Sequence, residues 1–241
     1  MIDAIYCLSL ERLKERRDKV INTLRDIHFC DVYLVDAVDG YSFDFGDFYN
    51  EGIYEYKEWK LSVEQSQLQT NSGSINMIYW QREVNKGEIG CGLSHFLAWK
   101  HAHELKLERV LFLEDDFYFN YHEFIHGLEI FNTFAKYRLC DIFYLGSKPL
   151  IDGTPIDENI IQCNYTYLLH AYILQKDAIR VLVNGNYLSN IITPDEYVPA
   201  SYCLHPRSDI RKLYKFEKRL SAYRLKTDVV HQNDSGGSQT F

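Results

Sequence analysis

The chain has 241 residues, of which 46% are hydrophobic and 15% aromatic, so it can bury a core of ordinary size. Its 34 acidic residues outnumber its 26 basic ones, which gives a net charge of -8. This balance, without any basic block, does not favour a nucleic-acid groove or a patch for anionic membranes. A small polar or metal-bridged ligand fits the charge better.

Cysteine spacing and hydropathy indicate the compartment. The six cysteines are scattered singly, without a Cys-x-x-Cys pair, which favours reduced thiols over a disulfide framework or a zinc site. No run of apolar residues approaches the length of about 18 that a membrane span needs, and no signal peptide is visible. We therefore expect a cytoplasmic protein without a membrane span.

The first part of the chain predicts an α/β fold. Residues 3–10 read as a strand, 11–27 as a helix that Ser9 could cap, and 31–40 as a second strand ending in a turn. Strand, helix, strand is the unit of a parallel sheet. Residues 41–86 mix aromatic, acidic and small polar residues without a sustained period, and we interpret them as an excursion over the sheet.

Helices and strands continue to alternate after the excursion, and no linker or repeat divides the chain. We therefore expect a single domain over residues 1–241. The predicted elements, in order, are a glycine turn and helix over 85–108, a strand over 109–117, a helix over 121–137, a strand over 140–146, a strand over 165–175, a helix over 176–187, a proline-stiffened loop over 192–206 and a short strand from 229.

One stretch, ERVLFLEDDFYF, runs from an apolar segment directly into three consecutive carboxylates. The apolar part predicts a buried strand, whereas adjacent carboxylates repel one another and resist burial unless water or a cation surrounds them. Residues two apart share a strand face, so Glu114 and Asp116 would project together and Asp115 would point away. Mg²⁺ and Mn²⁺ prefer such oxygen ligands. A solvated acidic turn is the alternative.

A second stretch, GEIGCGLSHFLAWK, places three glycines within six residues, next to Ser94 and His95. It lacks the pattern of a phosphate-binding loop. Neighbouring residues of a helix point apart, so Ser94 and His95 do not form a catalytic dyad on sequence grounds. A helix N-cap followed by a packed histidine is the simpler interpretation.

Together these stretches resemble glycosyltransferase family 25, which includes bacterial lipooligosaccharide galactosyltransferases and procollagen galactosyltransferases. The segments that carry the resemblance are IYCLSLERLKER, DAVDG, GEIGCGLSHFLAWK, VLFLEDDF, HAYILQKDAIRVL, TPDEYVP and VVHQNDSGGS. They run from about residue 2 to 238 and leave out the excursion. The resemblance implies a GT-A type nucleotide-sugar-binding fold, with a mostly parallel central sheet flanked by helices.

The resemblance also implies the ligands and their residues. Mn²⁺, or Mg²⁺, would be held against the diphosphate of UDP-galactose or UDP-glucose by Asp116, by Glu114 as a second ligand or ribose contact, and by His231. A structural role for His231, and a solvated helix face for Arg12 and Arg16, which the resemblance places near the uridine, are the alternatives. The residues expected near the nucleotide are Tyr6, Leu8, Ser9, Leu10, Arg16, Asp36, Asp39 and Asp115.

An inverting transfer needs a general base for the acceptor hydroxyl, and TPDEYVP supplies Asp195 and Glu196, with Asp195 slightly favoured. A retaining enzyme would need no such base, and a surface turn with two solvated acids is the alternative. The aromatic residues of the excursion could form an acceptor-binding flap. They are Tyr54, Tyr56, Trp59, Tyr79 and Trp80.

The expected activity is metal-dependent transfer of a hexose from a UDP-sugar to a hydroxyl. Collagen hydroxylysine or galactosylhydroxylysine is the favoured acceptor, and a lipooligosaccharide or other glycan is the alternative. The missing signal peptide suggests a bacterial, viral or truncated source. A non-catalytic sugar- or nucleotide-binding module, and a nucleotidyltransferase or phosphatase using the same carboxylates, are different classes that stay open. A homo-oligomer stays open as well.

Overall fold

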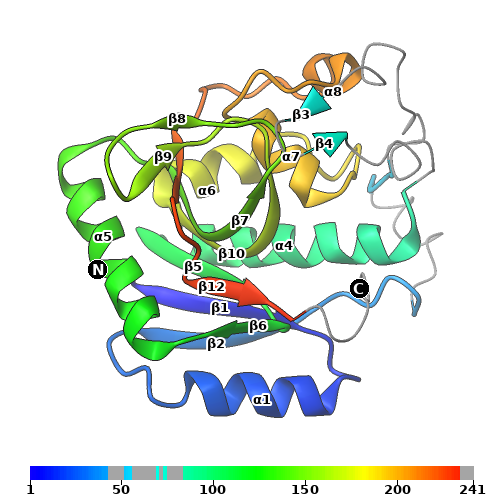
Figure 1. Ribbon diagram of the computed structural model, residues 1–241. Helices are drawn as coiled ribbons and strands as arrows, with labels where there is room; N and C mark the ends of the chain where they lie inside the picture. The colour runs from blue at the N-terminus through cyan, green and yellow to red at the C-terminus, as the bar shows by residue number, and fades with distance from the viewer. Residues whose placement is uncertain (43–51, 56–68, 71–72, 75–83, 234–241) are drawn as a thin grey trace.

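A computed structural model describes residues 1–42, 52–55, 69–70, 73–74 and 84–233 (Figure 1). These residues form a central eight-stranded sheet, in which the strands lie side by side in the order β2-β1-β5-β10-β7-β11-β9-β8. Its strands are β1 (Ala4–Ser9), β2 (Asp31–Asp36), β5 (Arg109–Glu114), β7 (Ile142–Pro149), β8 (Thr154–Pro155), β9 (Ile160–Gln162), β10 (Thr166–Gln175) and β11 (Ala222–Leu225).

Helices and two smaller sheets complete the described fold. The helices are α1 (Lys14–Leu24), α4 (Lys86–Glu104), α5 (Tyr121–Tyr137), α6 (Lys176–Val183), α7 (Pro194–Ala200) and α8 (Ser208–Leu213). One small sheet pairs β6 (Phe117–Phe119) with β12 (Val230–Gln232), and the other pairs β3 (Gln69–Thr70) with β4 (Gly73–Ser74).

The expectation of an α/β fold is confirmed, but the expectation of a mostly parallel sheet is wrong, because the sheet is mixed. Strand β1 is parallel to β2 and β5, whereas β10 is antiparallel to both of its neighbours, β5 and β7. A buried strand has the same apolar composition in either direction. Its direction depends on how the connections run, and the sequence pattern does not carry that information.

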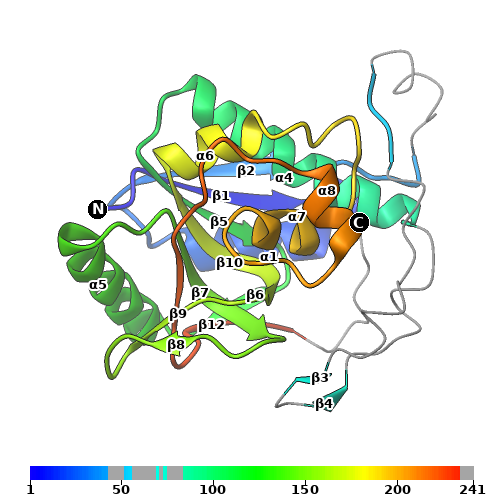
Figure 2. The same cartoon turned by 90° about the horizontal axis from the view of Figure 1, so that it is seen from above.

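Each face of the sheet has its own core. Along β1, Tyr6 and Leu8 face α4, and Ile5 and Cys7 face α1, which follows the two-residue alternation of a strand. Figure 1 shows β1 and β2 between α1 and α4. Figure 2 shows α5 and α6 on opposite sides of β10 and β7, in agreement with the two cores. The protein is therefore a three-layer α/β structure in its described part.

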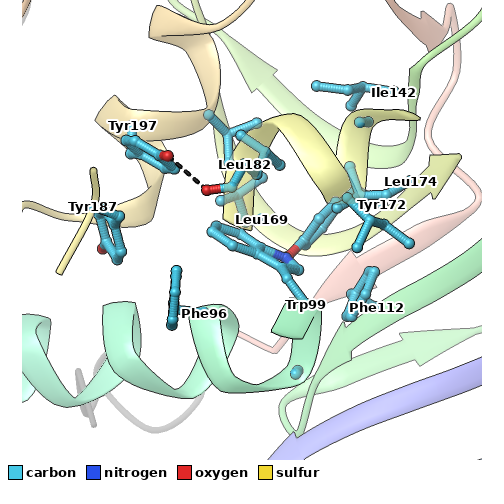
Figure 3. Close-up of a cluster of buried hydrophobic side chains, with 14 of the residues drawn as sticks. Phe96, Trp99, Phe112, Ile142, Leu169, Tyr172, Leu174, Leu182, Tyr187 and Tyr197 are labelled. Atoms are coloured by element: carbon cyan, nitrogen blue, oxygen red, sulfur yellow. Dashed lines mark hydrogen bonds between the residues drawn. The ribbon is translucent and has the colours of Figure 1, made fainter. Parts of the chain in front are cut away.

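The core on the α4 side contains many aromatic side chains (Figure 3). Trp99, Phe112, Tyr172 and Tyr197 are all fully buried there. A buried tyrosine must satisfy its hydroxyl, and Tyr197 donates to the carbonyl of Leu182 at 2.7 Å. The aromatic rings thus bring polar groups into the core as well as apolar area.

The glycines of GEIGCG do not form a turn, which corrects the expectation above. They lie inside α4, whose N-cap is Asn85 in a capping box with Glu88. A Cβ at Gly90 would stand 2.5 Å from the carbonyl oxygen of Val38, so glycine permits the loop after β2 to cross the helix closely. Ser94 is not a cap either: its hydroxyl accepts from the amide of Val38 at 2.7 Å and donates to the Gly90 carbonyl.

We expect Gly90→Ala to lower the free energy of unfolding by about 1–3 kcal/mol, because the added methyl group collides with backbone that cannot rotate away. The preference of helices for alanine, worth about 1 kcal/mol, acts in the opposite direction and is the smaller effect. Urea unfolding measures the difference. Leu97→Ala, at an exposed position of the same helix, is the control. Equal stability of Gly90→Ala and wild type would show that the crossing is not tight.

Three further expectations are settled by the described elements. The segment TPDEYVP is a helix, not a loop, because Pro194 occupies the first helical position, where its missing N–H costs nothing. Ser9 does not cap α1, whose N-cap Leu13 has no side-chain bond. All six cysteines are free thiols, as expected. Within the described chain, no helix is long and apolar enough to cross a membrane.

Candidate active site

The carboxyl ends of β1 and β5 meet at one edge of the sheet, where Leu8 pairs with Glu114. Ligands of α/β proteins bind at such edges. Strand β5 ends at Glu114, and Asp115 and Asp116 occupy the turn before β6. Glu114, Asp115 and Asp116, which we call the EDD motif, therefore lie at the end of the sheet where ligands of such folds bind.

Each of these three acids has a different partner. Glu114 Oε1 lies 3.1 Å from Nε2 of His95. Asp116 Oδ2 accepts a hydrogen bond from the side-chain amide of Gln232 at 2.9 Å. Asp115 points elsewhere, as expected from strand alternation. It is buried and accepts from the Ser9 hydroxyl at 2.8 Å and from Arg16 at 3.1 Å, which ties β5 to β1 and α1.

The electrostatics of Glu114 and Asp116 fit a cation. Burial raises the pKa of Glu114 to about 8, with repulsion from Asp116 and Asp115 adding to it. Burial likewise raises the pKa of Asp116. The second oxygen of Asp116, Oδ1, is buried and has no hydrogen-bond partner among the described residues. A divalent cation such as Mn²⁺ or Mg²⁺ would neutralise the charges of Glu114 and Asp116 and would give the unpartnered oxygen a partner. The residues present therefore fit the expected metal.

The structure also brings Cys91 and His95 to Glu114. One ligand atom of each of these three residues lies within 4.8 Å of the other two. Cys91 and His95 stand four residues apart on α4, so they share a helix face. Burial lowers the pKa of His95 to about 4, which keeps the imidazole neutral, and it raises the pKa of the Cys91 thiol. Sequence reasoning treated His95 as a packed residue; the i, i+4 spacing of Cys91 and His95 was the available signal.

Six of the eight residues expected around the nucleotide separate into two groups. Ser9, Arg16 and Asp115 come together at the sheet edge, as the bonds above show. Tyr6 instead fills the core, with its hydroxyl 2.7 Å from Nδ1 of His101, and Leu8 and Leu10 are buried too. The nucleotide contacts expected of these three residues stay a prediction.

The two acids expected near the base or ribose form surface ion pairs. Asp36, at the end of β2, pairs with Arg17 at 2.7 Å, and Asp39 pairs with Arg12 at 2.5 Å. Both pairs lie near the edge at which β1 and β5 end, since Asp36 is in register with Ser9. Their nucleotide contacts stay a prediction.

His231 lies on β12, and the structure does not bring it into the group around Glu114. Its ring packs on Tyr118 at 5.2 Å between centroids, and it lines a surface pocket together with Glu123 and Asp228. The neighbouring Gln232, on the other face of the strand, makes the contact with Asp116 instead. The role of His231 as a metal ligand stays a prediction.

Asp195 faces the site from the first turn of α7. Its Oδ1 accepts the backbone N–H of Leu168 at 2.8 Å, at an irregular part of β10 where Leu168 has a φ of 71°. Burial raises the pKa of Asp195 to about 7, Glu114 adds to this shift and His95 opposes it. These interactions place Asp195 within electrostatic range of Glu114.

Glu196 has a different environment, although it is the next residue. It is fully buried, and its carboxylate accepts from the hydroxyl of Tyr165 at 2.9 Å, from Tyr167, and lies 2.7 Å from Nε2 of His205. These contacts hold α7 against β10. Of the two acids proposed from the sequence, Asp195 is half-buried, whereas Glu196 is fully buried.

The expected acceptor flap lies almost entirely outside the described residues. Tyr56, Trp59, Tyr79 and Trp80 all fall there. Tyr54 is described: it is exposed, and its backbone bonds to Leu188 and Ile191 next to α7.

Comparison with known proteins identifies the family of the chain. Residues 2–198 match the family model described as glycosyltransferase family 25 (LPS biosynthesis protein). The chain is 27% identical over 246 residues to procollagen galactosyltransferase 2 of Mus musculus, which covers 99% of this chain and 36% of that protein. It is 29% identical over 218 residues to procollagen galactosyltransferase 1-B of Xenopus laevis, covering 86% of this chain and 32% of that protein.

One relative comes from a virus, and its name gives two activities. The chain is 26% identical over 256 residues to the procollagen lysyl hydroxylase and glycosyltransferase of Acanthamoeba polyphaga mimivirus, covering 100% of this chain and 26% of that protein. The chain thus spans about a third or less of the length of these relatives. The match to the family model covers most of the chain, and the protein is an enzyme of glycosyltransferase family 25.

Proposed function

We propose that this enzyme transfers a hexose, galactose or glucose, from a UDP-sugar to a hydroxyl group in the presence of Mn²⁺ or Mg²⁺. The observation that carries the proposal is the pair Glu114 and Asp116 at the carboxyl end of β5, with raised pKa values and an unpartnered buried oxygen. Together with the family, this pair supports a GT-A type arrangement, in which carboxylates at a strand end would hold the metal, and the metal would hold the diphosphate.

Glu114 and Asp116 would hold the cation, and Gln232 would orient Asp116 through its amide. A bound divalent cation neutralises negative charge that develops on the leaving diphosphate. Arg16 is partly exposed beside the same edge, where it pairs with Asp115, and we propose that it contacts the nucleotide.

We propose Asp195 as the general base of an inverting transfer. A base works best when its pKa lies near the working pH, and burial raises the pKa of Asp195 to about 7. The Leu168 N–H fixes one carboxylate oxygen and leaves the other for the proton of the acceptor hydroxyl. Glu196 is enclosed by Tyr165, Tyr167 and His205, so we assign it no contact with the acceptor.

For the acceptor we propose collagen hydroxylysine or galactosylhydroxylysine. Support comes from the names of the relatives, several of which are procollagen galactosyltransferases. The description of the family model, an LPS biosynthesis protein, favours a lipooligosaccharide or other glycan as the second candidate.

The deciding experiment measures UDP release from a panel of UDP-sugars with Mn²⁺ or EDTA, for wild type and Asp116→Ala, with and without deglycosylated collagen peptide. We expect metal-dependent release from one donor, lost in Asp116→Ala and stimulated by the peptide. Release without stimulation would keep the transferase and move the acceptor to another class. Release of pyrophosphate or phosphate instead of UDP would indicate a nucleotidyltransferase or phosphatase. Binding of a UDP-sugar without any turnover would indicate a non-catalytic module.

A further inference from the structure

A chain of hydrogen bonds leads from the aromatic core to Glu114. The indole N–H of Trp99 donates to the hydroxyl of Tyr172 at 2.8 Å. That hydroxyl lies 2.7 Å from Nδ1 of His95, and Nε2 of His95 lies 3.1 Å from Oε1 of Glu114. Trp99, Tyr172 and His95 are all fully buried. Figure 3 shows Trp99 of α4 beside Tyr172 of β10.

The first donor, the indole N–H of Trp99, sets the direction of the whole series of hydrogen bonds. Tryptophan can only donate, so the Tyr172 oxygen is the acceptor of the first bond. The hydroxyl proton of Tyr172 then needs an acceptor, and Nδ1 of His95 is its only other hydrogen-bond partner in the described part of the chain. If Nδ1 accepts, the proton of a neutral imidazole sits on Nε2, facing Glu114.

The opposite tautomer would leave two groups badly placed. With the proton on Nδ1, the Tyr172 oxygen would accept twice, and its own buried proton would have no partner among the described residues. The lone pair of Nε2 would also face the carboxylate oxygen of Glu114 when this acid is ionised, as it is when it binds a cation. Buried polar groups without partners are costly, so the geometry selects the tautomer that donates to Glu114.

We propose that Trp99 and Tyr172 are positioning residues that hold His95 with its proton on Nε2, so that His95 donates to Glu114 and fixes the orientation in which this carboxylate receives the cation. This gives His95 a role through Glu114 and not as a metal ligand. Partners of this kind, behind a metal-binding carboxylate, tune metal affinity. The cation part of the inference rests on the proposed function, whereas the tautomer of His95 does not.

The test compares Tyr172→Phe with Tyr144→Phe. Both tyrosines are fully buried in neighbouring strands, but the hydroxyl of Tyr144 bonds to Tyr202 at 3.1 Å, away from the chain to Glu114. Nitrogen NMR of isotope-labelled protein, with the His95 signals assigned by their loss in His95→Gln, reads which ring nitrogen carries the proton. We expect the proton on Nε2 in wild type and Tyr144→Phe, and a mixture of tautomers in Tyr172→Phe.

Mn²⁺ binding, followed by electron paramagnetic resonance of the free ion, gives the second measurement. We expect Tyr172→Phe to weaken binding about tenfold or more, and Tyr144→Phe to leave it unchanged. In His95→Gln the side-chain amide keeps a donor toward Glu114 without needing Tyr172. Adding Tyr172→Phe to His95→Gln should therefore cause no further loss of affinity.

A proton on Nδ1 in wild type would overturn the inference, and so would an unchanged tautomer in a folded Tyr172→Phe. Equal Mn²⁺ affinity of Tyr172→Phe and wild type would overturn the link to the cation while leaving the transferase intact. If wild type itself binds no Mn²⁺, the proposed function loses its metal and the link to the cation falls with it, and the tautomer still decides whether Trp99 and Tyr172 orient His95.

Discussion

Glu114→Gln is expected to lower kcat for UDP-sugar turnover by about 10²–10³-fold and to weaken the apparent affinity for Mn²⁺. Glutamine has nearly the shape of glutamate and can still accept the bond from His95 at the position of Oε1. It removes the negative charge, which is the property that a divalent cation beside a diphosphate requires. The effect should therefore reside in metal binding and catalysis and not in folding.

Rates of UDP release over a range of Mn²⁺ concentrations, at saturating UDP-sugar, separate these two effects. Glu104→Gln is the matched control, because it removes the same charge from an exposed side chain on α4. We expect this control to behave as wild type. Full turnover by Glu114→Gln with an unchanged dependence on Mn²⁺ would remove Glu114 from the metal site and leave Asp116 as the remaining candidate of the pair.

The sequence predicted correctly those helices and strands whose signal lies within the element itself. Residues 121–137 were predicted as a helix, and α5 has those bounds. The strand that ends in the EDD motif was also predicted, since an apolar run followed by three carboxylates has few other interpretations. In both cases the signal lies within about 20 neighbouring residues, which is the range over which periodicity is readable.

The sequence could not show which distant residues meet. His95 bonds to Tyr172, 77 positions further along the chain, and Asp116 to Gln232, 116 positions further on. These contacts exist because β10 pairs with β5 and β12 pairs with β6. Neither pairing can be predicted from the pattern of neighbouring residues. The prediction of a glycine turn at the start of α4 was wrong for the same reason. Gly90 leaves room for the loop after β2, which packs against the helix, and it does not form a turn in its own segment.

Asp195→Asn is expected to lower kcat by about 10²–10⁴-fold, the usual range for loss of a general base. Asparagine keeps the acceptor for the Leu168 N–H but cannot take the proton of the acceptor hydroxyl. The pH dependence gives the sign. Asp195 works as a base only when it is ionised, and its pKa is raised to about 7, so wild-type kcat/KM should fall as the pH drops below about 7. That decline should be absent in Asp195→Asn.

The neighbouring acid supplies the matched comparison. Glu196→Gln alters a fully buried carboxylate bound to Tyr165 and His205, so we expect it to lower the melting temperature more than kcat. Asp177→Asn, an exposed acid in the first turn of α6 just as Asp195 lies in the first turn of α7, should change neither. The anomeric configuration of the product, read by NMR, completes the argument. Inversion requires a base such as Asp195, whereas a retained configuration together with full activity of Asp195→Asn would show that its raised pKa reflects burial alone.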